Sequence, residues 1–115
     1  MRVGSDLDAF TAELDKVELR VRAVVAAGRG SFFEGSESYD RASMAIIRLA
    51  ALFENEKRFA RFLSAATAIE RQGISHTRNV AGHAGYIAMD DEIFWRTVTV
   101  QVPQFIAKLR HVNAI

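Results

Sequence analysis

The chain has no cysteine and only one proline among its 115 residues. Without cysteine it forms no disulfide, has no thiol nucleophile and offers no thiolate ligand to a metal ion. One proline and seven glycines leave room for long helices, because these two residue types interrupt helices most strongly. We therefore expect an all-α protein, and the lack of cysteine fits the reducing cytosol without requiring it.

The chain also lacks a strong net charge and a long apolar run. Its formal net charge is +1, with 15 basic and 14 acidic residues, which argues against a protein that coats nucleic acid through charge alone. No apolar run approaches the roughly 18 residues that span a membrane, and residues 1–6 lack the apolar segment of a signal peptide. We expect a single domain over residues 1–115, in the cytoplasm and without a membrane span.

The charged residues are unevenly distributed along the chain. Acidic residues crowd the first predicted helix, at Asp6, Asp8, Glu13, Asp15 and Glu18. Arginines dominate the middle of the chain, at Arg41, Arg48, Arg58, Arg61, Arg71 and Arg78. Two interpretations stay open: the arginines form the solvated faces of helices, or they line a basic groove that receives phosphates.

Apolar residues recur at spacings of three and four, which predicts amphipathic helices. The first helix is expected over about residues 5–27 with Ser5 as its N-cap, and the second over about residues 38–55. A third helix ends at Gly73 and a fourth is capped by Ser75, unless the two are continuous. A fifth follows an N-cap at residue 90 or 91 and is kinked near residues 99–102 by Pro103. This pattern predicts a small up-down bundle of four to five helices.

The same spacings identify the side chains that should face the core. They are Leu7, Phe10, Leu14, Val17, Val21, Val24, Tyr39, Ala42, Ile46, Ile47, Leu49, Phe53, Phe59, Phe62, Ala66, Ile69, Phe94, Val98, Val102, Phe105, Leu109 and Val112. Phe32 and Phe33, in the loop after the first helix, are expected to pack onto the same core, and Trp95 to anchor the core or an interface.

The fourth predicted helix carries the residues that suggest chemistry. One polar stripe combines positions three and four apart, namely His76, Asn79, His83 and Tyr86. An apolar stripe beside it contains Ile74, Ala81, Ala84 and Ala88, and a third line contains Arg78, Gly82 and Gly85. Each glycine inside a helix costs about 1 kcal/mol relative to alanine, so this line is expected to approach another backbone or a ligand closely.

A histidine and an arginine without a carboxylate cluster suit RNA cleavage that needs no metal ion. The imidazole of His83 would take the proton of a ribose 2′-hydroxyl, and Arg78 would stabilise the charge that develops on the phosphate. Asn79 would orient the phosphate or the imidazole. On one ideal helix Arg78 and His83 point about 140° apart, so their meeting requires the length of arginine, the space over Gly82 or a second subunit.

Two structural, non-catalytic interpretations of these residues remain open. A histidine on a helix is more often a surface or hydrogen-bonded residue than a catalyst, and the polar stripe is then only an interface of a helical dimerisation module. His76 and His83 lie roughly 10 Å apart along a helix, too far to share one metal ion. We expect no metal site, and for His76 at most a weak contact with substrate.

The motif Arg78-Asn79-x-x-x-His83, followed by Tyr86, resembles the RX4-6H motif of HEPN domains. More narrowly, it is similar to the motif of HepT-like toxins that are paired with MNT-type nucleotidyltransferases. Residues 89–98 read Met-Asp-Asp-Glu-Ile-Phe-Trp-Arg-Thr-Val and are followed by Val102-Pro103. They resemble the acidic cap, the apolar pair with tryptophan and the later Leu-Pro of that family, and the resemblance covers about residues 5–112.

The resemblance implies a helical homodimer with the motif at the dimer cleft. It also implies a metal-independent endoribonuclease without a cofactor, the toxin of a type II or type VII toxin–antitoxin pair. Its partner antitoxin is then an MNT-type nucleotidyltransferase, and its catalytic residues are Arg78 and His83 with Asn79 between them. The alternative is a non-catalytic HEPN partner, or a substrate-binding subunit of a nucleotidyltransferase.

In the family, a tyrosine just after the histidine accepts AMP from the antitoxin, which silences the toxin. Here the candidate is Tyr86, but the spacing is His-x-x-Tyr where the family has His-x-Tyr. One extra residue rotates the phenol by about 100° on a continuous helix. Two possibilities follow: the helix ends at Gly85 and a turn restores the direction, or Tyr86 is not the modified residue.

Overall fold

The computed structural model describes residues 2–82 and 90–115, and every regular element in these ranges is helical. The elements are α1 (Arg2–Ala27), η1 (Arg29–Ser31), α2 (Glu37–Glu54), α3 (Glu56–Phe59), η2 (Ala60–Phe62), α4 (Ala68–Gly82), α5 (Asp91–Arg96), the π-helical η3 (Thr97–Gln101) and α6 (Val102–Val112). The fold is the small all-α bundle that the sequence predicts. None of these helices has the length and apolar character needed to cross a membrane.

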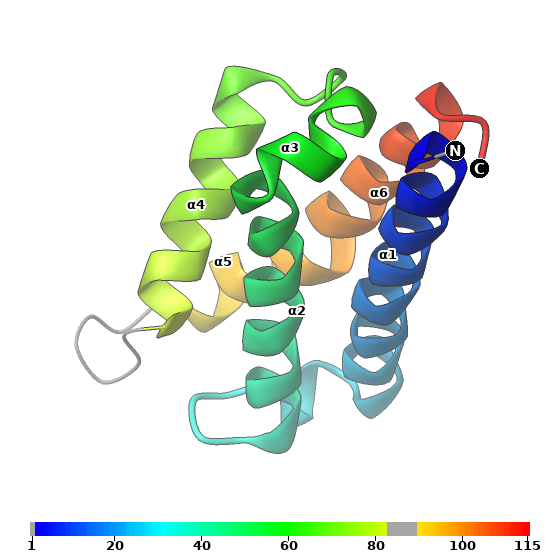
Figure 1. The fold of residues 1–115 in the computed structure, drawn as a ribbon. Helices are drawn as coiled ribbons and strands as arrows, with labels where there is room; N and C mark the ends of the chain where they lie inside the picture. Colours follow the sequence, from blue (N-terminus) through cyan, green and yellow to red (C-terminus); the bar gives the residue numbers. More distant parts are fainter. Residues whose placement is uncertain (1, 83–89) are drawn as a thin grey trace.

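The helix α2 occupies the centre of the bundle. It packs against α1 on one side and against α4 on the other, while α5, η3 and α6 run behind them (Figure 1). The start of α1 and the end of the chain after α6 lie at the same end of the bundle (Figure 1). The two outer helices, α1 and α4, therefore lie on opposite sides of α2.

The core lies between α1, α2 and the α5–α6 segment. The stripes predicted on these helices are buried, with Phe10, Leu14, Leu49 and Phe94 fully inaccessible to solvent. By contrast, α4 buries no side chain among residues 68–80, and only Ala81 near its end is buried. The helix that carries the candidate site is thus the least embedded of the long helices.

The structure has neither of the N-caps that the sequence suggested at Ser5 and Ser75, because both helices begin earlier. α1 already begins at Arg2, so Ser5 lies inside it. α4 begins at Ala68 and continues through Gly73, so Ser75 is not an N-cap. Thr67 and Glu70 form a capping box there: the Thr67 hydroxyl accepts from the Glu70 N–H at 3.1 Å, and the Glu70 carboxylate accepts from the Thr67 N–H at 2.8 Å.

Four of the side chains expected in the core are exposed instead: Phe33, Ile47, Ile69 and Val112. Ile69 lies in the first turn of α4 and is 80 % exposed, so no other element of the described chain covers it. Phe32, the other loop phenylalanine, is buried against Tyr39, Phe94 and Trp95. Spacing alone identifies an apolar face but not whether another element covers it.

The last helical segment departs from a regular α-helix just before Pro103, where the sequence predicts a kink. Asp90 is the N-cap of α5, and its carboxylate accepts from the N–H groups of Glu92 and Ile93. A π-helical turn, η3, then precedes Pro103, which lies in the first turn of α6. Proline has no N–H to donate to the preceding turn, and π-helical turns commonly accompany such interruptions.

The acidic side chains of α1 are partners of arginines from later elements. Arg58 Nε and Arg61 Nη2 donate to the two carboxylate oxygens of Asp6, at 3.0 and 2.8 Å. Arg48 pairs with Glu13 at 3.3 Å, and Arg110 of α6 pairs with Asp15 and Glu18. The uneven charge distribution thus serves largely to join α1 to α2, α3 and α6.

Asp6 makes stability depend on pH in a predictable direction. The hydrogen bond from Arg58, with a further contribution from Arg61, holds the pKa of Asp6 below its usual value of 3.8. A carboxylate with a lowered pKa in the folded state stabilises the protein above its unfolded pKa, and this contribution is lost as the pH falls through the folded pKa. Asp6→Asn should therefore lower the unfolding midpoint at pH 7 and lower it progressively less below about pH 4.

Urea unfolding across a pH series measures this effect, and Asp8→Asn is the matched control because Asp8 is exposed on the same helix. An equal loss in the two variants at pH 7 would contradict a role for the pairs with Arg58 and Arg61.

Candidate functional site

The motif residues Arg78 and Asn79 lie near the end of α4. The Arg78 side chain is partly buried and forms an ion pair with Glu54, the last residue of α2. Arg78 Nε also donates to Asn79 Oδ1 at 3.2 Å. Asn79 and His76 are exposed, so the structure brings Arg78 and Asn79 together at the surface and places His76 one turn earlier on the same helix.

His83 and Tyr86 lie outside the described residues, and so do Ala84, Gly85 and Ala88. The pairing of Arg78 with His83 and the direction of the Tyr86 phenol therefore stay predictions. α4 ends at Gly82 and Asp90 caps α5, so the described chain stops directly before the histidine and resumes one residue before α5.

A cleft of about 160 Å³ lies between α2 and α4. Its lining includes Phe53 and Glu54 from α2 and Arg71, Ser75 and Arg78 from α4; we call it the arginine cleft. Residues 71, 75 and 78 share one face of the helix because they are four and three apart. The line that the sequence identified at Arg78 and Gly82 therefore extends back by two turns to Arg71.

Arg71 is held in the arginine cleft by two contacts. Its guanidinium carbon lies 5.0 Å from the centroid of the Phe53 ring, an arrangement in which the ring face attracts the cation. Its Nη2 atom donates to the backbone carbonyl of Leu63 at 3.1 Å. Neither contact neutralises the charge, so Arg71 presents a fixed positive group at the surface.

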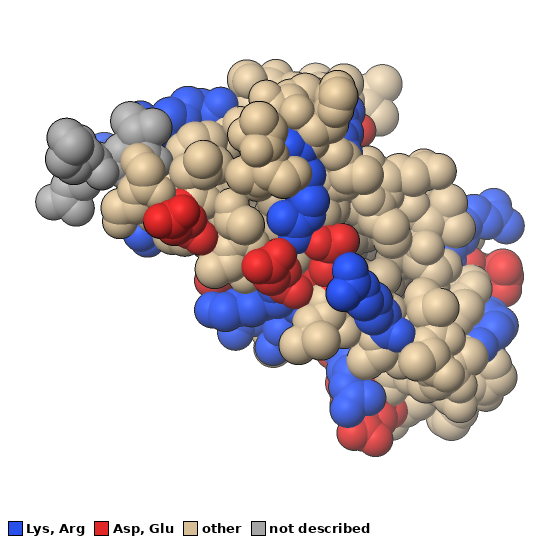
Figure 2. Space-filling model, turned by 90° about the vertical axis from the view of Figure 1, so that its right-hand side faces the viewer, with Lys and Arg blue, Asp and Glu red and all other residues tan. Residues whose placement is uncertain are grey.

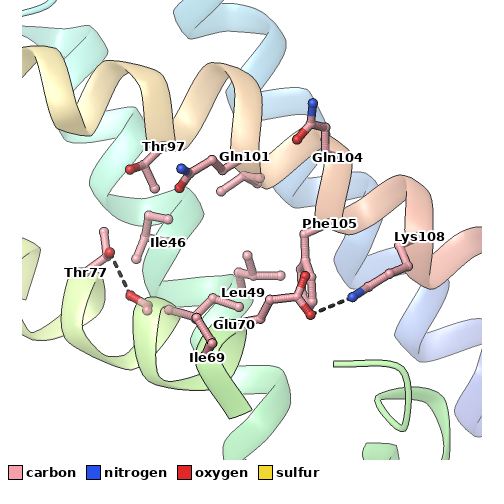
Figure 3. A pocket seen from close by; sticks show the side chains of 13 residues that line it. Ile46, Leu49, Ile69, Glu70, Thr77, Thr97, Gln101, Gln104, Phe105 and Lys108 are labelled. Carbon is pink, nitrogen blue, oxygen red and sulfur yellow. Dashed lines mark hydrogen bonds and ion pairs between the residues drawn. The ribbon is translucent and has the colours of Figure 1, made fainter. Parts of the chain in front are cut away.

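The other side of α4 faces a larger groove, of about 520 Å³, that opens toward η3 and α6. We call it the α4–α6 groove. Ile46 and Leu49 of α2 and Phe105 of α6 line its floor, while Thr77, Thr97 and Gln101 lie along its rim (Figure 3). Lys108 and Glu70 face each other across one end at 2.6 Å (Figure 3). This groove is mainly apolar, and its one cation is already paired.

The Glu70–Lys108 pair also affects the titration of Glu70. Partial burial acts to raise the pKa of Glu70, but the hydrogen bonds from Lys108 and from the Thr67 backbone outweigh it and hold this pKa below its usual value. Glu70 is therefore ionised at neutral pH. It joins the first turn of α4 to α6 and limits how far α4 separates from the bundle.

Charges of both signs are interspersed on the surface. Figure 2 shows Lys and Arg side chains beside Asp and Glu side chains, without one continuous basic area on this face. In the ranges 2–82 and 90–115, no three His, Asp or Glu side chains gather as ligands for a metal ion. Positive charge on this face is therefore local rather than part of one continuous basic area.

The comparisons with protein-family models, curated proteins and solved structures find no match to this chain. The resemblance to HEPN domains therefore rests on the residues quoted from the sequence alone. The sequence analysis named Arg78 and Asn79 as candidates and kept open a basic groove that included Arg71 and Arg78, but it did not single out Glu54. The seven-residue spacing of Arg71 and Arg78 was a usable signal, whereas the pairing of Glu54 with Arg78 joins two helices and has none.

Replacing Glu70 separates its two roles. Glu70→Ala removes the carboxylate half of the capping box and the ion pair with Lys108, and should lower the free energy of unfolding by about 1–2 kcal/mol. Glu70→Gln keeps an acceptor for the Thr67 N–H and loses only the partly exposed ion pair, so it should cost less than about 1 kcal/mol. Urea unfolding at pH 7 measures both values, and equal costs would show that the capping box contributes nothing.

Proposed function

We propose that this chain is a metal-independent endoribonuclease, the toxin of a HepT-like toxin–antitoxin pair. The observation that carries the proposal is that Arg78 and the exposed Asn79 lie together near the end of α4, five and four residues before His83 in the sequence. An arginine matches the geometry of phosphate, and histidine is the side chain that exchanges protons most readily at neutral pH.

In the proposed reaction, His83 removes the proton from a ribose 2′-hydroxyl. The 2′ oxygen then attacks the adjacent phosphorus, and Arg78 stabilises the negative charge of the pentavalent transition state. The P–O5′ bond breaks, and the 5′ oxygen receives a proton from the imidazolium ion. The products are a 2′,3′-cyclic phosphate and a 5′-hydroxyl end, and Asn79 orients the phosphate through its amide.

The resemblance supports a homodimer as the active form and silencing by a nucleotidyltransferase partner. In that silencing step the Tyr86 oxygen attacks the α-phosphate of ATP, a P–O bond to Tyr86 forms, and pyrophosphate leaves. The added AMP would bring bulk and negative charge to a residue three positions after His83 in the sequence. Both effects oppose the binding of an RNA phosphate.

Incubation of total RNA with the purified chain in EDTA tests the proposed activity. We expect cleavage with 2′,3′-cyclic phosphate ends, and a loss of at least about 100-fold in rate for His83→Ala, because the variant has no general base. His111→Ala is the matched control, since His111 is exposed on α6 and should leave the rate unchanged.

Full cleavage by His83→Ala would rule out the assigned base. Absence of cleavage by folded protein whose intact mass shows no added AMP would rule out the nuclease itself.

A second candidate function is that of a non-catalytic partner of a nucleotidyltransferase. The observation that favours it is the α4–α6 groove, whose rim carries Ile69 with 80 % of its surface exposed. An exposed apolar side chain beside an apolar groove is typical of a protein-binding surface. This candidate predicts no RNA cleavage at any excess of protein.

On this second candidate, a purified MNT-type nucleotidyltransferase should form a stable complex with the chain. Ile69→Glu should weaken that complex at least about tenfold, because a charge would enter an apolar contact. Ile93→Glu is the matched control, since Ile93 is also an exposed isoleucine, on α5. Calorimetric titration measures the affinity of each variant for the nucleotidyltransferase. Equal affinities of the two variants would rule out the α4–α6 groove as the binding surface.

A further inference from the structure

The arginines in the middle of the chain are not equivalent. Each of five forms an ion pair with an acidic side chain: Arg41 with Glu37, Arg48 with Glu13, Arg58 and Arg61 with Asp6, and Arg78 with Glu54. Within the described residues, Arg71 forms no ion pair. Of the six arginines that the sequence singles out, Arg71 thus keeps its charge available to a ligand.

The surroundings of Arg71 hold it in a position to bind. The ring of Phe53 and the carbonyl of Leu63 restrict the Arg71 side chain. Arg71 is nevertheless exposed to solvent. An arginine has five N–H donors, and the bond to Leu63 uses one of them. A guanidinium group that is already ordered loses less conformational entropy when it binds an anion.

Arg71, Ser75 and Arg78 form a line along α4 that borders one cleft. The two arginines are two helical turns apart, about 10.5 Å along the axis, and the exposed Ser75 lies between them. The cleft includes one acidic side chain, Glu54, against two arginines. Arginine and serine side chains are common ligands of backbone phosphates, so the line suits a chain with repeated phosphates rather than a single anion.

The sequence around this line supports the same conclusion. No Asp or Glu occurs in residues 71–89, although the whole chain has 14 acidic residues. The segment contains Arg71, Arg78, His76 and His83 as its basic or titratable imidazole residues. On the far side of α4, Lys108 is paired with Glu70. The unbalanced positive charge near α4 therefore lies on the arginine cleft rather than in the α4–α6 groove.

We propose that Arg71, Ser75 and Arg78 form a binding track for the phosphates of single-stranded RNA. This proposal rests on the proposed function, because it assigns the RNA next to the cleaved bond to the arginine cleft. Arg71 binds one backbone phosphate, Ser75 donates a hydrogen bond to the strand, and Arg78 binds the phosphate of the bond that is cleaved. Glu54 occupies Arg78 in the free protein and competes with that phosphate.

The test measures binding separately from cleavage. The probe is a short single-stranded RNA of mixed sequence with 2′-O-methyl riboses, which has no 2′-hydroxyl to attack. Fluorescence anisotropy over a series of salt concentrations gives its affinity for the full chain. Arg71→Gln removes the charge and keeps an amide donor for Leu63, and Arg71→Lys restores the charge; thermal melting confirms that both variants are folded.

We expect Arg71→Gln to weaken binding about tenfold. The slope of log affinity against log salt concentration should fall by about 0.7, the value for one phosphate contact with a single strand. Arg71→Lys should recover most of the affinity. Arg22→Gln is the matched control, because Arg22 is exposed on α1, on the opposite side of α2, and should leave affinity and slope nearly unchanged.

Removing the competing carboxylate gives a change in the opposite direction. Glu54→Gln should strengthen binding about two- to fivefold, the worth of an exposed ion pair. Its matched control is Glu37→Gln. Glu37 is likewise an α2 residue that pairs with an arginine, in its case Arg41 of the same helix. Equal affinities of Arg71→Gln and Arg22→Gln, or no gain with Glu54→Gln beyond that of Glu37→Gln, would overturn the track.

The outcomes also separate this proposal from the proposed function. Arg71-dependent binding of the 2′-O-methyl probe without cleavage of ordinary RNA would support the binding track and rule out the nuclease activity. Cleavage of ordinary RNA, together with probe binding that does not change in the Arg71 and Glu54 variants, would support the nuclease activity and rule out the binding track.

Discussion

The packing of α4 mainly against α2 is the constraint on which the candidate site depends. The other long helices bury their apolar stripes in a shared core, whereas α4 buries only Ala81 among its described side chains. A helix held from one side leaves space on both flanks of its contact line. One flank becomes the arginine cleft and the other becomes the α4–α6 groove. The contacts from Glu70 to Thr67 and Lys108 position the first turn of α4 and so determine the shape of both.

Ion pairing then decides which of these surfaces is basic. A protein with a net charge of +1 has nearly enough carboxylates to neutralise every cation, and most of the arginines singled out here are used to join helices. Charge remains available where an exposed arginine has no ion pair within the described residues, as is the case for Arg71. A nearly neutral chain can in this way present a local site for phosphate without a basic surface as a whole.

Many elements of the fold were predictable from residue spacing. The buried stripes of α1 and α2, the cap at Asp90 and the irregular turn before Pro103 follow from local rules of periodicity, capping and proline geometry. The start of α4 was not predicted, since the Thr67–Glu70 capping box outweighs a single glycine at position 73. The exposure of Ile69 was also missed, because periodicity defines an apolar face but not the neighbour that covers it.

For the candidate site, the sequence by itself determined that Arg78 and Asn79 lie together on a helix. That result needs only neighbouring residues in a helical backbone. Only the tertiary structure decided that Glu54 pairs with Arg78 and that both Arg71 and Arg78 border one cleft. It also decided that Arg71 has no ion pair within the described residues. Residues 54 and 78 belong to different helices, and the packing of α4 on α2 brings them together. Local spacing carries no information about a contact of that kind.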